Sequence, residues 1–187
     1  MTGSELHTIR VDDEIVIRPL IASDAEPVFA LVDANRAYLA RWLPWVDGIS
    51  TIDDERQWIE RMADPDSHDR ERPYAIEHRG VVVGGIGIIV EPINRSGEIG
   101  YWLAEAMQGS GIVTRACRAL LDDAFRSQGL HRLFIRTDPE NRRSRAVPER
   151  LGFVCEGTQR ESLYANGEYR DAIVYSVLAS EWPARKQ

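Results

Sequence analysis

The sequence predicts an α/β (α+β) fold, with a mixed, mostly antiparallel central sheet and helices on both faces. Three observations predict it. Strand-like runs follow one another at hairpin spacing in the middle of the chain, helical patterns stand on both sides of them, and a helical segment then separates two further strands. The expected order is β-α-α-β-β-β-α-β-α-β-β. With 187 residues, no linker-like stretch and no internal repeat, we expect a single domain over 1–187, with its core at about 15–178.

The first part of the chain predicts a strand pair and two helices. Apolar residues alternate on both sides of the polar break Asp12-Asp13-Glu14, which predicts a bent or hairpinned strand over 7–20. Ser23-Asp24-Ala25-Glu26 has the form of a capping box and predicts the start of one helix. Thr51-Ile52-Asp53-Asp54 predicts the start of a second helix, and a polar loop is expected over 63–72.

The remaining elements follow from changes in the apolar period. Two-residue alternation and turn residues predict strands at 73–78, 81–90, 97–103, 131–137 and 153–156. Apolar residues at helical spacing predict a long helix over 112–126, and a shorter one is expected over 141–151, closed by Gly152. A last hairpin pairs the residues around 162–164 with 169–178, because Asn166-Gly167 suits a type I′ turn.

Composition excludes several classes of protein. No apolar run approaches the roughly 20 residues that cross a membrane, and Met1–Arg10 lacks the apolar centre of a secretory signal, so we expect a cytoplasmic protein without a membrane partner. A net charge of −7 argues against nucleic-acid binding. The same charge either steers a cationic amine toward the protein or only keeps it soluble.

Cysteine and histidine spacing predicts no metal site. Cys117 and Cys155 fall in a helical and a strand-like segment, and without a secretory signal we expect two buried thiols rather than a disulfide. The four histidines show neither metal-ligand nor triad spacing; they are His7, His68, His78 and His131.

A glycine-bearing turn over Gln108–Thr114 joins a strand to the long helix. Free amides at a helix N-terminus and the helix dipole favour phosphate there, although an ordinary turn would look similar. A Walker loop is excluded because the turn has no lysine. A dinucleotide fingerprint fails at Thr114, where its last glycine should stand, and it normally opens a parallel sheet. The coenzyme A pyrophosphate pattern, Gln/Arg-x-x-Gly-x-Gly/Ala, is met except at Val113.

Four segments in this order resemble the GCN5-related N-acetyltransferase (GNAT) superfamily, and in particular its RimJ/RimL-like, ribosomal-protein branch. The resemblance spans about Ile15 to Leu178. In that branch the turn commonly ends in a bulkier residue followed by Thr, as Val113-Thr114 does here. The segments are Asn35-Arg36-x-Tyr38-Leu39-x-x-Trp42-Leu43-Pro44-Trp45, Gly100-Tyr101-Trp102-Leu103, Gln108-Gly109-x-Gly111-Ile112-Val113-Thr114 and Asn141-x-x-Ser144-x-x-Val147-x-Glu149-x-Leu151-Gly152-Phe153.

The resemblance implies an acetyl-CoA-dependent N-acetyltransferase in which a neutral amine attacks the thioester directly within a ternary complex. It implies that a splayed strand end offers main-chain groups to the pantetheine arm at Trp102 and Leu103, and that Asn141, also a credible helix N-cap, touches the coenzyme. The pyrophosphate would be held by Gln108, Gly109, Ser110, Gly111, Ile112, Val113 and Thr114.

The resemblance also implies two catalytic roles. The hydroxyl of Ser144 would protonate the leaving thiolate, and no tyrosine lies between Asn141 and Phe153 to take that role. The branch can place a glutamate as general base at the position that Leu163 fills here. Glu161, two residues away and on the same face of a regular strand, would substitute. Alternatively, Glu161 is a surface residue and a water chain removes the proton.

The acceptor would meet aromatic side chains. Tyr38, Trp42, Trp45 and Tyr164 either wall an acceptor cleft or belong to the core. The branch suggests a protein N-terminal α-amine, an aminoacyl small molecule as alternative, and a homodimer. Two rival functions are a non-catalytic acyl-CoA sensor and a nucleotide-dependent oxidoreductase.

Overall fold

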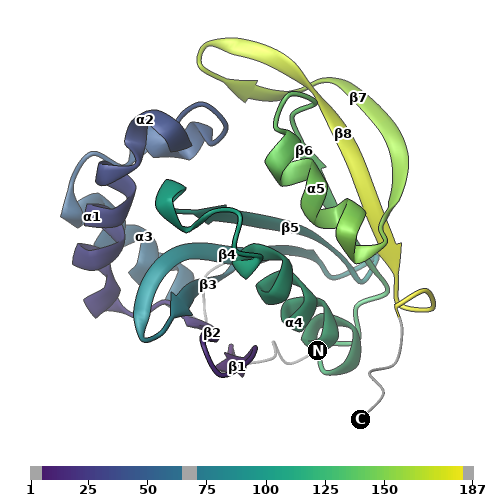
Figure 1. Cartoon of the computed structure of the whole chain (residues 1–187), viewed down its shortest axis with the longest axis horizontal. Helices are drawn as coiled ribbons and strands as arrows, with labels where there is room; N and C mark the ends of the chain where they lie inside the picture. Colours follow the sequence, from purple (N-terminus) through teal and green to yellow (C-terminus); the bar gives the residue numbers. More distant parts are fainter. Residues whose placement is uncertain (1–5, 65–70, 183–187) are drawn as a thin grey trace.

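The computed structural model describes residues 6–64 and 71–182 (Figure 1). None of the helices in these two ranges is long and apolar enough to cross a membrane. The strands are β1 (Ile9–Arg10), β2 (Ile15–Pro19), β3 (Glu71–His78), β4 (Val81–Glu91), β5 (Ser96–Leu103), β6 (Arg132–Thr137), β7 (Val154–Ala165) and β8 (Glu168–Leu178). The helices are α1 (Ala25–Ala34), α2 (Arg36–Leu39), α3 (Ile52–Ala63), α4 (Ile112–Arg126) and α5 (Arg142–Leu151), with 3-10 turns η1 (Ala22–Asp24), η2 (Pro44–Gly48) and η3 (Glu105–Met107).

The strands form one sheet in the order β1-β2-β3-β4-β5-β6-β8-β7. Neighbouring strands are antiparallel except β5 and β6, which run parallel and are connected through α4. Two neighbouring strands can run parallel only if such a crossover joins them, because the chain must return to the end of the sheet where the first strand began. The expected mixed, mostly antiparallel sheet is confirmed.

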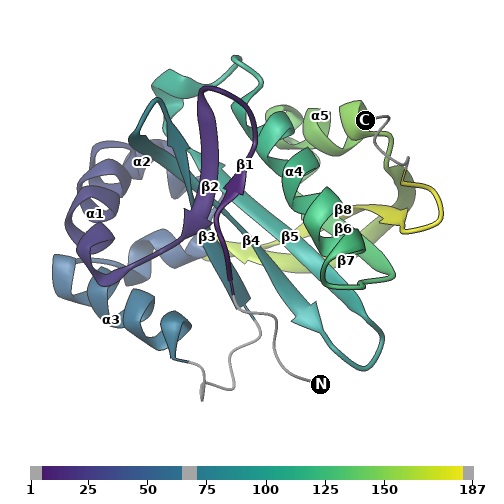
Figure 2. The same ribbon diagram turned by 90° about the horizontal axis from the view of Figure 1, so that it is seen from below.

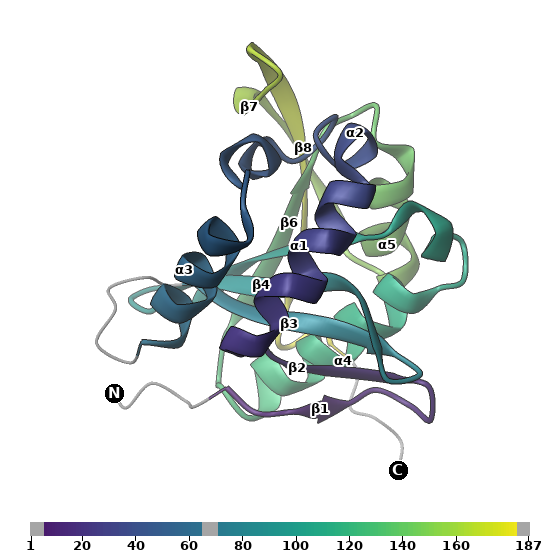
Figure 3. The same cartoon turned by 90° about the vertical axis from the view of Figure 1, so that its left-hand side faces the viewer.

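Helices cover both faces of the sheet (Figure 2). α4 and α5 pack against each other and against β5 and β6, whereas α1 packs against α3 and β4. In Figure 3, α1 lies in front of β3 and β4. The apolar stripe of α4, which includes Ala116, Leu120 and Leu121, is fully buried in the main core. A smaller core forms under α1 from Val28, Val32, Leu39 and Val46, with Tyr38 and Trp102 packed against it.

The starts of the first two long helices differ in how well the sequence predicted them. The Thr51 capping box is confirmed, with Thr51 Oγ1 accepting from Asp54 N at 3.1 Å and an Asp54 oxygen accepting from Thr51 N at 2.8 Å. The Ser23 box is wrong, since the chain first makes η1 and α1 begins at Ala25. Asp24 instead accepts from Ile21 N at 2.9 Å and from Arg18 at 2.7 and 2.8 Å, so an ion pair with the preceding strand occupies the carboxylate that a capping box would leave free.

The structure also tests the predictions for the first strand pair, the last hairpin and the cysteines. The first segment is a hairpin of β1 and β2, and the strands expected at 153–156 and around 162–164 are one strand, β7. Most of the loop expected at 63–72 lies outside the described residues, as does His68. Both cysteines are free thiols, as expected, and burial raises the pKa of the Cys117 thiol. The expectation that Cys155 is buried as well is wrong, because this residue of β7 is exposed.

Candidate active site

The parallel pair β5 and β6 separates along its length. The two strands pair only where Ser96–Glu98 of β5 meets Arg132–Phe134 of β6, while β6 continues beside β8 as far as Thr137. Beyond Glu98, the side of β5 that faces away from β4 has no strand partner in the described part of the chain. Residues 99–103 therefore present main-chain donors and acceptors as a sheet edge does, in the interior of the sheet.

The pairing with β4 shows which residues point to this open side. Ala104 N donates to Val83 O at 2.9 Å, and main-chain groups alternate sides along an antiparallel strand. Leu103 and Tyr101 therefore direct their N–H and C=O groups away from β4. Trp102 lies at the alternate position, and its carbonyl points at β4: a Cβ added to Gly84 would lie 2.3 Å from that oxygen. Of the two residues predicted to offer main-chain groups, Leu103 faces the opening and Trp102 does not.

The glycine turn lies directly after β5 and η3. Gly109 and Gly111 have φ of +78° and +75°, in the left-handed region that glycine adopts without strain. Within the described residues, the amides of 109–114 have no hydrogen-bond acceptor, and the N-cap Gly111 has no side chain to supply one. These amides stand at the N-terminal end of a 15-residue helix. The turn can therefore hold an anion.

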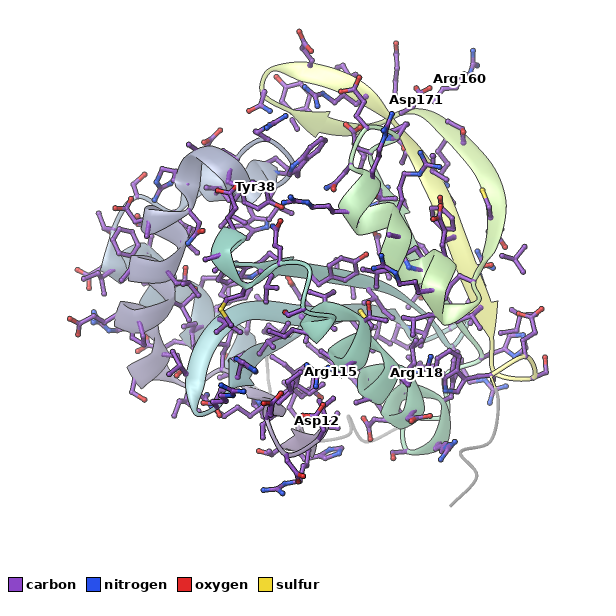
Figure 4. The ribbon with its side chains drawn as sticks, in the orientation of Figure 1. Asp12, Tyr38, Arg115, Arg118, Arg160 and Asp171 are labelled. Atoms are coloured by element: carbon purple, nitrogen blue, oxygen red, sulfur yellow. The ribbon has the colours of Figure 1, made fainter. Side chains whose placement is uncertain are left out.

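The charged side chains near this turn are not the ones nearest in sequence. Arg115 pairs with Asp12 at 2.7 Å, and Arg118 lies over the Trp182 ring, 5.5 Å from its centroid (Figure 4). The cation that reaches the turn is Arg143 of α5, which donates to the side-chain oxygen of Gln108. Sequence reasoning missed Arg143. The available signal was an arginine pair in the first turn of a helix, where the dipole disfavours positive charge.

The first turn of α5 is tied to the open stretch of β5. Asn141 is the N-cap of α5, which confirms one of its two predicted roles. Its Oδ1 accepts from Ser144 N at 3.1 Å. The Tyr101 hydroxyl donates to Ser144 O at 2.9 Å and lies 3.1 Å from Ser144 Oγ. Burial raises the pKa of Tyr101, so its hydroxyl stays protonated. Tyr101 stands well before the segment 141–153 in the sequence, so the spacing around Asn141 did not indicate it.

Glu161 does not lie where strand alternation placed it. Gln159 pairs with Ala172 and Leu163 with Arg170, so three residues of β7 stand opposite Asp171 alone. Within this bulge Glu161 has a φ of 49°, its N–H donates to Asp171 Oδ1 at 2.9 Å, and its side chain is exposed. The argument that Glu161 shares a face with Leu163 is therefore wrong, because a bulge breaks the two-residue period.

Two segments converge near the end of β5, one from α2 and η2 and one from the β7–β8 hairpin. In Figure 1 the hairpin tip extends toward α2, and Asn166 Nδ2 donates to Arg41 O at 3.4 Å. Arg36 fixes the η2 segment by donating to Val46 O at 2.6 Å and Ile49 O at 2.8 Å. The η2 segment and the hairpin tip form the two walls of this region, and the Asn166–Arg41 hydrogen bond joins them.

Of the four predicted aromatic residues, Trp45 and Tyr164 are exposed, whereas Tyr38 and Trp42 are partly buried. Tyr38 packs on the small core, and Trp42 carries the Arg41 guanidinium 5.4 Å above its ring. Trp45 is 39% exposed and meets Trp102 edge-on at 6.0 Å. Tyr164, 54% exposed, lies 5.0 Å from Tyr169.

Two surface hollows are lined by none of the residues that the sequence predicted for the site. One, of about 350 Å³, lies between the β1 segment and the end of α4 around Asp122 and Asp123, and the other, of about 340 Å³, lies on β6, β7 and β8 around Phe134. An open strand edge next to a helix N-terminus suits an extended ligand, and such a ligand does not require an enclosed hollow.

Comparisons with known proteins agree with this geometry. The model of the acetyltransferase (GNAT) domain matches residues 14–154. YdaF of Bacillus subtilis (strain 168), provisionally named a ribosomal N-acetyltransferase, is 36% identical, with 97% of this chain and 100% of YdaF covered. The ribosomal-protein-serine acetyltransferase of Escherichia coli (strain K12) is 28% identical over 91% of this chain and 96% of its own. The solved structure of RimL, a ribosomal L7/L12 alpha-N-protein acetyltransferase, in complex with coenzyme A superposes with a TM-score of 0.87 at 28% identity, covering 93% of this chain and 98% of that one.

Proposed function

The chain belongs to the GNAT acetyltransferase family, and on that premise we propose that it acetylates the N-terminal α-amine of a protein. It is an acetyl-CoA-dependent N-acetyltransferase. The observation that carries the proposal is the unpaired stretch of β5 next to the glycine turn, because it offers strand-like main-chain partners and an anion site in succession.

The residues of this chain fit coenzyme A in three places. The open main-chain groups of Tyr101 and Leu103 would bond the amides of the pantetheine arm as a neighbouring strand does. The free amides of 109–114 would hold the pyrophosphate at the start of α4, and the Arg143 guanidinium would add a positive charge beside them. We also propose that Asn141 contacts the coenzyme with the part of its side chain that does not cap α5.

The reaction requires a neutral amine, a donor for the developing oxyanion and a proton for the leaving thiolate. An N–H of the open β5 stretch is the proposed oxyanion donor, and the Ser144 hydroxyl is the proposed acid. We expect Ser144→Ala to lower kcat by about 100-fold, within the usual range for one general acid, with the Kd of acetyl-CoA changed less than about two-fold. An unchanged kcat would remove Ser144 from this role.

The general base decides which amine suits the site. Because Glu161 lies exposed on a bulge, we propose that the acceptor arrives partly neutral and loses its second proton to water. An α-amine with a pKa of about 7.7–8.0 is about 10–17% neutral at pH 7, whereas a lysine amine with a pKa of about 10.4 is only about 0.04% neutral. The names of two of these relatives, the ribosomal-protein-serine acetyltransferase and RimL, support the same acceptor class.

The acceptor side is proposed to admit a chain end. The Asn166–Arg41 hydrogen bond joins the two walls, and the exposed rings of Trp45 and Tyr164 lie one on each of them. Rigid aromatic rings can pack on an extended peptide without specifying its sequence. This arrangement supports a peptide N-terminus more than a compact small molecule.

Matched peptides test the proposal. Two versions of each ribosomal-protein N-terminal peptide would be compared by thiol release from acetyl-CoA: one with a free α-amine and blocked lysines, the other with a blocked α-amine and free lysines. We expect turnover only with the first. Faster turnover with the second version, with a polyamine or with an aminoacyl compound would refute the α-amine. Binding of acetyl-CoA without thiol release from any acceptor would favour the sensor function instead.

A further inference from the structure

Tyr101 and Ser144 connect the two halves of the site across the gap between β5 and β6. Tyr101 belongs to the part of β5 that has no strand partner on the β6 side in the described part of the chain. Ser144 lies in the first turn of α5. The Tyr101 oxygen lies 2.9 Å from Ser144 O and 3.1 Å from Ser144 Oγ. We propose that Tyr101 is a positioning residue that fixes the Ser144 hydroxyl for its role at the leaving sulfur. This inference rests on the role proposed for Ser144.

The hydrogen bonds hold residue 144 at three atoms. Its N–H donates to Asn141 Oδ1 at 3.1 Å, and its O and Oγ both lie within reach of one phenol. A serine in a helix otherwise turns its hydroxyl to solvent or to the carbonyl of the preceding turn. Because the phenol has one proton and two lone pairs, it can donate to Ser144 O and accept from Oγ, or donate to Oγ and leave the serine proton free for sulfur.

Tyr101 is placed to act through Ser144 and not in its stead. Its ring packs against the main core, and its hydroxyl points to α5. Burial raises the pKa of this phenol, so it keeps its proton and serves as a fixed hydrogen-bonding group. It also links the strand that would hold the thioester to the helix that carries the acid, at the point where the sheet provides no ladder between them.

A double-mutant cycle of Tyr101→Phe and Ser144→Ala tests this inference. Phenylalanine keeps the ring and the main chain of residue 101 and removes only the hydroxyl. We expect Tyr101→Phe to lower kcat by about 10-fold, with the KM for acetyl-CoA within two-fold. In the Ser144→Ala background the same change should alter kcat less than two-fold, because a positioning residue has no effect once its target is gone.

Tyr175 offers a matched control. It is a buried tyrosine of β8 whose hydroxyl also bonds α5, donating to Glu149 Oε1 at 2.9 Å and accepting from Arg145 Nε at 3.2 Å. Tyr175→Phe should lower the melting temperature about as much as Tyr101→Phe while leaving kcat unchanged. A fall in kcat equal to that of Tyr101→Phe would show that any lost hydroxyl under α5 disturbs turnover, and would overturn the proposal.

The remaining outcomes separate the two roles. If both single variants lower kcat and their effects multiply in the double variant, Ser144 keeps its role and the positioning role of Tyr101 is refuted. If Ser144→Ala alone leaves kcat unchanged, both roles are refuted. Ser144→Thr provides a second variant should Tyr101→Phe fold poorly. It keeps the hydroxyl and should restore most of the kcat lost in Ser144→Ala, whereas no restoration would contradict a fixed hydroxyl.

Discussion

Gly111→Ala tests the glycine turn, and its cost can be worked out from the structure. Gly111 has a φ of +75°, and a Cβ added there would meet nothing within 4 Å. The substitution is therefore free of clashes, and its cost is the left-handed backbone alone, about 1–2 kcal/mol for a non-glycine residue. In a chain of 187 residues each kcal/mol lowers the melting temperature by about 2–4 °C, so we expect a fall of about 2–8 °C.

The same substitution should weaken coenzyme binding. Alanine favours a relaxed turn in which the amides at the start of α4 no longer converge on one point. Losing one amide hydrogen bond to a charged phosphate costs about 1.5–3 kcal/mol, which raises the Kd of coenzyme A about 10- to 160-fold. Calorimetric titration with coenzyme A and thermal melting measure the two effects separately.

Gly129→Ala is the matched control for this prediction. Gly129 follows the other end of α4 with a φ of +66°, and a Cβ added there also meets nothing within 4 Å. The 15 residues of α4 separate the two glycines by about 22 Å. Both variants should lose similar stability, but only Gly111→Ala should lose affinity. Equal affinities in the two variants would refute the assignment of the turn.

Two further predictions concern charged residues. Arg143→Ala should raise the Kd of coenzyme A up to about five-fold at low salt and less at high salt, because Arg143 is an exposed cation. The melting temperature should stay equal or rise, because α5 loses a positive charge at its N-terminal end. An effect on the Kd that is undiminished at high salt would contradict this. Glu55 is a buried residue of α3, and burial raises its pKa to about 7 from 4.5. Between these two values the folded state holds a proton that the unfolded chain has lost. The stability from this carboxyl is complete below pH 4.5 and is lost as the pH rises through 7. Wild type should therefore lose about 2.5 kcal/mol more than Glu55→Gln between pH 5 and pH 8 in urea unfolding, and parallel losses would refute the prediction.

Local patterns of apolar residues were enough to predict most of the fold. Most of the strands and α4 follow from apolar periods that a few neighbouring residues define, and they were predicted nearly in place. The start of α1 was not, because Asp24 is held by Arg18 of β2 and so cannot be judged from the four residues of a capping box. The continuity of β7 was also missed, since its bulges interrupt the alternation by which a strand is read.

The site divides in the same way. The glycine turn and the Asn141 cap are contiguous in sequence, and both were predicted from residues a few positions apart. The contacts that complete the site join residues 35 and 43 positions apart, Gln108 with Arg143 and Tyr101 with Ser144. No local period reports such pairs, because the crossover through α4 and β6 alone brings them together.

The separation of β5 from β6 explains why those two contacts exist. Where β5 lacks hydrogen bonds to β6, its main chain is open to a ligand, but it is also not fixed to the β6 side of the sheet. Side chains must then hold the two banks of the opening at a defined distance. The Tyr101–Ser144 contact does so beside the proposed thioester position, and the exposed Gln108–Arg143 contact joins the same helix to the anion turn. Both end on the first turn of α5, so binding of the coenzyme and protonation of its leaving group depend on the position of one helix.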